Sequence, residues 1–167
     1  KAETIYSNVF NTEDALVRPI IASGTHAITL TLSGLLRPGD KLLSITGSPY
    51  DTLQKVIGVK GSEAGTFKDY GILYDEVPLD INGHIDINNV IKKIDDNTKI
   101  IEIQRSTGYS DRKAITIDEM EGVIREIKKY RNDIIIMVDN CYGEFVEALE
   151  PTDVGADIMA GSLIKNP

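Results

Sequence analysis

Two residues in the last third of the chain have the types and positions that pyridoxal phosphate chemistry requires. Asp139 follows an apolar run at residues 134–138, which predicts a buried strand that ends in a carboxylate. Lys165 comes shortly after a second short apolar run at residues 158–160. A lysine amine can attach to the cofactor aldehyde as a Schiff base, and a carboxylate can keep the pyridine nitrogen protonated. We therefore predict that both residues are catalytic and bind the cofactor.

A possible phosphate site lies at Ser23, Gly24 and Thr25, where an apolar helical pattern begins. The free N–H groups and the dipole of a helix N-terminus attract anions, and glycine lets the backbone approach a ligand closely. Taken alone, the segment is better explained as an ordinary helix cap, because Ser and Thr are common N-caps. His26 is expected to pack or to form hydrogen bonds rather than to catalyse.

Other polar residues also follow expected strands, and open α/β sheets bind ligands at the carboxyl ends of their strands. Tyr50 could stack on a flat aromatic ring or could simply be exposed in a turn. Ser162 places a hydroxyl three residues before the lysine. Cys141 is expected to be a small buried residue rather than a nucleophile. Arg105 is interpreted as either an anion contact or a surface charge.

These residues must be positioned by strands that alternate with helices. Strands are predicted at 15–21, 41–46, 72–79, 99–104, 134–139 and 157–161, helices at 25–36, 51–57, 86–94 and 116–130, and a short turn or helix at 151–154. Thr116 precedes Glu119 by three residues, which is the spacing of a capping box. The alternation predicts an α/β fold, a three-layer α/β/α arrangement with a mostly parallel sheet.

Composition restricts the classes of protein further. The chain has 167 residues, 41% of them hydrophobic and 26% charged, which is typical of one globular domain with a real core. Its net charge of −8 argues against nucleic-acid binding, which needs clustered basic residues. A single cysteine excludes an internal disulfide and favours the cytoplasm. No apolar run approaches the ~18 residues of a membrane span, and we predict no metal site.

Five phrases of the sequence, at residues 23–27, 36–40, 48–52, 138–145 and 160–167, resemble fold-type I pyridoxal-phosphate enzymes. The resemblance is to the cystathionine and methionine lyase group, and within it to bacterial proteins known as aluminium resistance proteins or methionine gamma-lyases. It implies that residues 1–167 form the cofactor-binding large domain of a pyridoxal-phosphate-dependent, transferase-like fold. This domain would be truncated at both ends and would lack the C-terminal small domain. It also implies a small amino-acid substrate and a homodimer or homotetramer.

The same resemblance implies a role for each candidate residue. Lys165 would hold the cofactor and later shuttle protons, and Asp139 would pair with the pyridine nitrogen. The backbone of residues 23–25 would hold the phosphate, helped by the Ser162 hydroxyl. Tyr50 would stack on the ring and assist as an acid or base. One departure is Ile164, which stands where the lyase group usually has a hydroxyl residue.

The implied activity is carbon–sulfur β- or γ-elimination from a sulfur-containing amino acid. A pyridoxal-phosphate aminotransferase stays open, because the two classes share these anchor residues. The alternative from another class is a non-enzymatic α/β domain that binds a phosphorylated metabolite, with residues 23–27 as its only functional site. Cys141 is a second departure, because the lyase group typically has threonine at its position.

Overall fold

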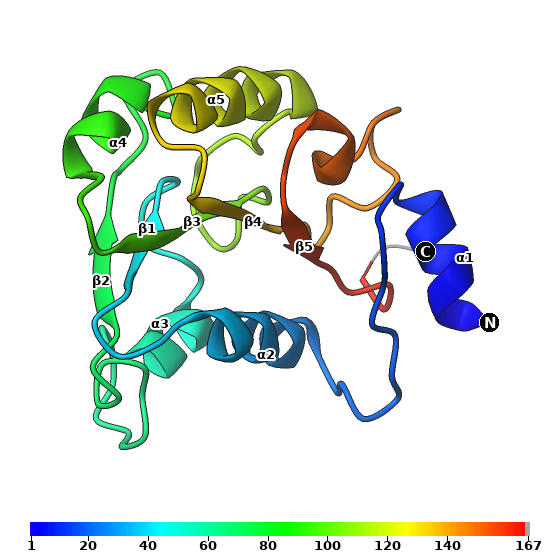
Figure 1. The fold of residues 1–167 in the computed structure, drawn as a ribbon, viewed down its shortest axis with the longest axis horizontal. Helices are drawn as coiled ribbons and strands as arrows, with labels where there is room; N and C mark the ends of the chain where they lie inside the picture. Colours follow the sequence, from blue (N-terminus) through cyan, green and yellow to red (C-terminus); the bar gives the residue numbers. More distant parts are fainter. Residues whose placement is uncertain (166–167) are drawn as a thin grey trace.

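A parallel five-stranded sheet forms the centre of the computed structural model, which describes residues 1–165. Its strands are β1 (Lys41–Ser44), β2 (Leu73–Glu76), β3 (Thr98–Gln104), β4 (Ile135–Asp139) and β5 (Ile158–Ala160), in the order β2-β1-β3-β4-β5. The helices are α1 (Ala2–Val9), α2 (Gly24–Leu35), α3 (Asp51–Ile57), α4 (Ile87–Lys93), α5 (Ile117–Tyr130) and the 3-10 helix η1 (Pro151–Val154). In Figure 1, α2 and α3 lie on one side of the sheet and α4 and α5 on the other. The predicted three-layer parallel fold is therefore confirmed.

Alternating side chains of the strands build two cores, one on each face of the sheet. On β3, Ile101 and Ile103 join the cluster beneath α4 and α5, whereas Ile100 joins the cluster against α2 and α3. Met137 of β4 belongs to the α2–α3 side as well. The helices thus fix the sheet from both sides, and polar residues on the α2–α3 face are enclosed between layers.

Helix α5 begins as its sequence predicts, but only half of the capping box forms. The Thr116 side chain accepts a hydrogen bond from the Glu119 N–H at 3.2 Å. The Glu119 carboxylate does not return the bond; it accepts instead from the Ile85 N–H at 2.8 Å. The glutamate therefore joins the start of α5 to the chain segment before α4.

The strand predicted at residues 15–21 is wrong. This segment is irregular in the structure, and the side chains of Leu16 and Ile20 are 67% and 81% exposed. Pro19 lacks an N–H for a strand ladder, and among residues 1–165 no strand pairs with this segment. Apolar residues alone did not distinguish an exposed connection from a buried strand.

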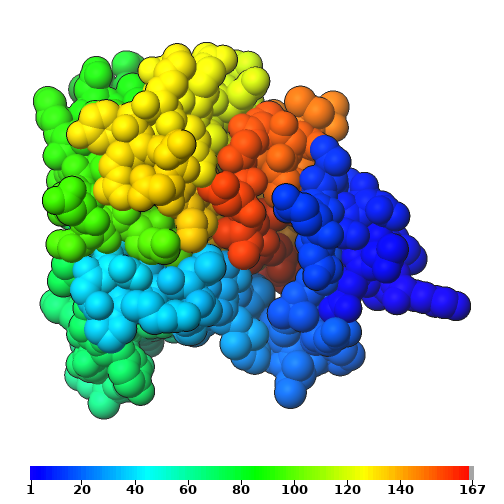
Figure 2. Space-filling model, in the orientation of Figure 1, coloured from blue at the N-terminus to red at the C-terminus, as the bar shows by residue number. Residues whose placement is uncertain are grey.

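The N-terminal helix α1 was not predicted, and it packs against the loop that follows β4. Phe10, directly after α1, lies with its ring centroid 5.2 Å from that of Phe145. The Thr152 hydroxyl donates to the Phe10 carbonyl at 2.6 Å. Figure 2 shows this blue segment against the orange and red surface of residues near the other end of the chain. Within residues 1–165, no helix combines the length and apolar character needed to cross a membrane.

Candidate active site

The carboxyl end of β4 places a buried carboxylate at the edge of the sheet. Asp139 is the last residue of β4 and is 2% exposed. Burial raises its pKa, because a low-dielectric surrounding disfavours the charged form. The Cys141 N–H, which donates to the carboxylate at 3.1 Å, and the charge of Lys165 oppose that rise. Asp139 is therefore suited to bind a cationic N–H group, which would stabilise its ionised form.

Lys165 lies in the turn after β5, at the same edge of the sheet. Its backbone N–H donates to the Ser162 carbonyl at 2.9 Å, which closes the turn. Its Nζ lies 4.6 Å from the centroid of the Tyr142 ring, within the range of a cation–π contact. The lysine charge also acts on the pKa of Asp139. The structure thus places the predicted amine close enough to the predicted carboxylate for their charges to interact.

The start of α2 faces these two residues. Ser23 caps the helix, its hydroxyl accepting from the His26 N–H at 3.1 Å. Within the part of the chain that the structure describes, the N–H groups of Gly24 and Thr25 donate to no protein acceptor. These two donors and the helix dipole form a position suited to an anion.

Close packing ties this helix start to the loops after β4 and β5. A Cβ placed on Gly24 would lie 2.7 Å from the Cys141 Sγ and 3.4 Å from the Ser162 Cβ. Only glycine fits at this contact without a shift, so Gly24 sets how closely α2 approaches the sheet. Ser162 consequently lies beside the start of α2.

Tyr50 connects the loop after β1 to the same place. Its hydroxyl lies 3.0 Å from the Thr25 Oγ1, to which it donates, and its N–H donates to the Gln104 Oε1 at 2.8 Å. Burial raises the pKa of Tyr50, so its phenol stays neutral across the physiological range. The residue is half-buried rather than free in an exposed turn.

Two subsidiary predictions concerned residues beside the site. His26 forms a hydrogen bond as expected, its Nδ1 accepting from the Ala22 N–H at 3.2 Å. Cys141 is buried as expected, at 5% exposed. Burial and the neighbouring Asp139 raise the pKa of its thiol, which disfavours the nucleophilic thiolate.

The interpretation of Arg105 as a surface charge is wrong, and the anions that it contacts are carboxylates of the chain itself. Its guanidinium is 3% exposed and donates to Asn140 Oδ1 at 2.8 Å and to the Gly143 carbonyl at 2.7 Å. It also donates to Glu147 Oε2 at 2.6 Å. Arg105 therefore fixes the loop that follows Asp139, and its partners lie too far along the sequence for local patterns to reveal them.

Glu144 is a residue of the site that the sequence did not single out. It is 1% exposed, and its Oε1 accepts from the Ser162 N–H at 2.5 Å. A Cβ on Gly161 would lie 2.5 Å from the same oxygen. Glu144 thus holds the chain that leads to Lys165, and the only local signal for it is the adjacent glycine at the turn.

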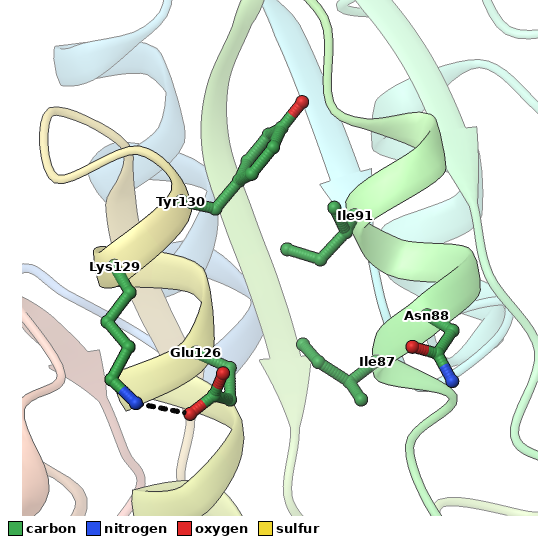
Figure 3. Close-up of a pocket in the computed structure, with 6 residues that line it drawn as sticks. All are labelled: Ile87, Asn88, Ile91, Glu126, Lys129 and Tyr130. Atoms are coloured by element: carbon green, nitrogen blue, oxygen red, sulfur yellow. Dashed lines mark hydrogen bonds and ion pairs between the residues drawn. The ribbon is translucent and has the colours of Figure 1, made fainter.

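Two cavities lie away from the Asp139 carboxylate and the Lys165 amine. One, of about 340 Å³, lies between α4 and α5 and is lined by Ile87, Asn88, Ile91, Glu126, Lys129 and Tyr130. Figure 3 shows Ile87 and Ile91 pointing from α4 toward α5, and the ion pair between Lys129 and Glu126 on α5. The other, of about 730 Å³, lies beside α2 and α3 and has Thr25 among its lining residues.

Comparison with known proteins decides the family. The family model described as methionine gamma-lyase matches residues 1–167. The chain belongs to the methionine gamma-lyase family. The Bacillus subtilis protein YnbB, whose name states no activity, is 56% identical over 99% of the chain. The chain covers 39% of the length of YnbB, so this family member corresponds to less than half of that relative.

Solved structures agree with the family assignment. A Listeria innocua structure, named "putative cystathionine beta-lyase involved in aluminum resistance", is 58% identical with a TM-score of 0.96. The alignment covers 99% of this chain and 40% of the Listeria chain. A Campylobacter jejuni structure that contains N'-pyridoxyl-lysine-5'-monophosphate is 23% identical, covers 97% of this chain and 34% of that one, and has a TM-score of 0.68. This last likeness shows a shared fold.

Proposed function

We propose that this family member is the cofactor-binding large domain of a pyridoxal-phosphate-dependent carbon–sulfur lyase that acts on a sulfur-containing amino acid. The observation that carries the proposal is the joint placement of Asp139, Lys165 and the start of α2 at one edge of the sheet. The methionine gamma-lyase family and the names of the solved relatives support the same reaction class. Cytoplasmic location and homo-oligomer formation remain part of the proposal for the whole protein.

The residues present fit pyridoxal phosphate. The phosphate would be held by the Gly24 and Thr25 N–H groups and the Ser162 hydroxyl, and the close contact of Gly24 with Cys141 keeps these N–H groups beside Ser162. The buried Asp139 carboxylate matches a protonated ring nitrogen, since a buried charge needs an opposite charge. Tyr50 would lie against the ring with a neutral phenol.

The chain's own groups would then divide the reaction between them. When bound, pyridoxal phosphate supplies an aldehyde that captures amines and a ring that withdraws electrons from the substrate Cα. Asp139 would keep the ring nitrogen protonated. Lys165 Nζ would hold the cofactor, and in its free form Nζ would remove the substrate α-proton as a general base. Loss of a β-thiolate would then use the electron pair at Cα to form the Cα–Cβ double bond, and the thiolate would take up a proton. Loss of a γ-thiolate would first require removal of a second proton, from Cβ.

Borohydride reduction of the full-length protein tests this proposal. After supply of pyridoxal phosphate, reduction and peptide mass mapping, we expect a pyridoxyl adduct on Lys165. The Lys165→Ala variant should give no adduct, and Asp139→Asn should keep the adduct but lose most turnover with thiol-releasing amino acids. A folded protein that leaves Lys165 unmodified would instead favour a non-enzymatic domain for a phosphorylated metabolite. Transfer of the substrate's amino group to a keto acid, without release of a thiol, would favour an aminotransferase.

A further inference from the structure

A second carboxyl group lies inside the sheet, near Asp139. Glu102 is in the middle of β3 and is 1% exposed. In the register between β3 and β4, Gln104 pairs with Asp139, so Glu102 is two positions before the residue opposite Asp139. Positions two apart on a strand point to the same face. Glu102 and Asp139 therefore share the α2–α3 side of the sheet. The proposed function gives a role to Asp139 but none to Glu102.

The two hydrogen-bond contacts of Ser44 favour a proton on Glu102. Ser44 Oγ lies 2.6 Å from Glu102 Oε2 and 2.8 Å from the Gly47 carbonyl oxygen. A serine hydroxyl has one hydrogen, and a carbonyl oxygen can only accept. Ser44 can donate to Gly47 and still bond Glu102 only if the glutamate is a neutral acid whose O–H donates to Ser44.

The other oxygen of the glutamate agrees with a neutral acid. Among the described residues, Glu102 Oε1 is buried and has no hydrogen-bond partner. Leaving a carboxylate oxygen unsatisfied inside a protein costs much more free energy than leaving the carbonyl of a neutral acid unsatisfied. The position of Oε1 thus favours protonation independently of the Ser44 contacts.

The charged and titratable groups around Glu102 come from four elements. They are Asp139 on β4, Tyr50 before α3, Tyr74 on β2 and Arg112 in the loop after β3. Glu76 of β2 is on the same face, on the far side of Ser44 from Glu102, and accepts from the Tyr74 hydroxyl at 2.6 Å. Burial raises the pKa of Glu102 to about 7, and the charge of Asp139 raises it as well. Arg112 lowers it, as would a hydrogen bond donated by Ser44, but the Gly47 carbonyl competes for the one Ser44 hydrogen. Burial also raises the pKa of both tyrosines, so they add no charge. Glu102 is then neutral below about pH 7 and ionised above it.

We propose that Glu102 is a positioning residue that acts through Asp139, holding a proton so that the two carboxyls carry a single negative charge located on Asp139. The proposal rests on the proposed function of Asp139 as the partner of the ring nitrogen. A second charge on Glu102 would change the electric field at Asp139 and at any group bound to it. Under this proposal, Glu102 is neutral and Asp139 is ionised, because their surroundings differ.

Infrared spectroscopy of the cofactor-free, full-length protein tests the proton on Glu102. The difference between wild type and Glu102→Gln should contain a protonated-carboxyl band at about pH 6 that disappears by about pH 8. Glutamine keeps the shape of the neutral acid, so the variant should fold. Ile101→Val, on the opposite face of β3, should keep the band and its midpoint. Asp139→Asn should lower the midpoint, because it removes the charge that raises the Glu102 pKa.

The absorbance of the bound cofactor tests the coupling to Asp139. Wild type should show a spectral transition at the pH where Glu102 titrates in the loaded protein, and Glu102→Gln should lack it and resemble the low-pH wild type. The absence of the carboxyl band, a band that Asp139→Asn does not shift, or an unchanged spectral profile in Glu102→Gln would each overturn the proposal. The two proposals can fail separately. If Asp139→Asn shifts the band but Lys165 takes no cofactor, the interaction between the two carboxyls is supported and only the proposed function is refuted.

Discussion

Gly24 and Cys141 are in direct contact, although 116 residues separate them along the chain. A Cβ on Gly24 would stand 2.7 Å from the Cys141 Sγ, closer than real Cβ atoms come to other heavy atoms. The backbone at Gly24 does not need glycine for its dihedral angles, since its φ is not in the left-handed region. The glycine is required because the start of α2 must lie against the loop that follows Asp139.

Gly24→Ala should therefore weaken both folding and cofactor binding. The new methyl group must push α2 away from Cys141, and such overpacking typically costs about 1–3 kcal/mol. The displacement also moves the two N–H groups proposed to hold the phosphate. We expect a lower unfolding temperature and a raised Kd for pyridoxal phosphate, measured by thermal unfolding and by absorbance titration of the full-length protein.

The same helix offers a matched control. Gly34 of α2 is exposed, and a Cβ there would meet nothing within 4 Å. Gly34→Ala should stabilise the protein by about 0.5–1 kcal/mol, because alanine has the better helix propensity, and it should leave cofactor binding unchanged. Adding Cys141→Ala to Gly24→Ala should recover part of the loss. Equal effects of the two glycine variants would contradict the contact argument.

The fold and most of the candidate site could be predicted because their signals are local. The apolar run before Asp139 indicates a strand covered on both faces, and the structure places it in the sheet between β3 and β5. Each predicted site residue ends or follows a strand or lies at the start of a helix, and parallel strands bring such positions to one edge. The parallel topology thus explains why motifs that are far apart in the sequence lie at one candidate site.

What the sequence missed depends on contacts between distant segments. Arg105 looks like any loop arginine until its guanidinium meets Asn140, Gly143 and Glu147. Glu102 interrupts an apolar strand, but its burial beside Ser44 follows only from the strand register. The error at residues 15–21 has a similar origin, because apolar content cannot show whether a partner strand exists.

Replacing Arg105 should strongly destabilise the loop that carries the site. Arg105→Met removes the donors to Asn140 and Gly143 and leaves the buried Glu150, 3.7 Å from the guanidinium, without its counter-charge. Breaking such a buried ion pair costs about 3–5 kcal/mol. Denaturant unfolding should show this loss. Lys129→Ala, which removes an exposed pair with Glu126, should change the unfolding free energy little.

Stability should depend on pH through Glu102. Its pKa is raised from 4.5 to about 7 on folding, so the folded state binds the proton more tightly than the unfolded state. The resulting stabilisation is complete below about pH 4.5 and is lost as the pH rises through about 7. Relative to Glu102→Gln, cofactor-free wild type should lose about 3 kcal/mol of unfolding free energy across that interval. A constant difference between the two proteins would contradict the assignment.

Cys141 should be inert in the folded protein. Burial and the neighbouring Asp139 raise the pKa of its thiol, and the thiolate is the form that reacts. At pH 8, a disulfide-exchange reagent should modify the folded protein at least about tenfold more slowly than the protein unfolded in denaturant. Lys165→Ala should slow the reaction further, because the lysine charge favours the thiolate. Rapid modification of the folded protein, or faster modification of Lys165→Ala, would show that the thiol is more accessible or less coupled to Lys165 than its position predicts. Gly24→Ala supplies the opposite case, since moving α2 away from the thiol should expose it and speed the reaction.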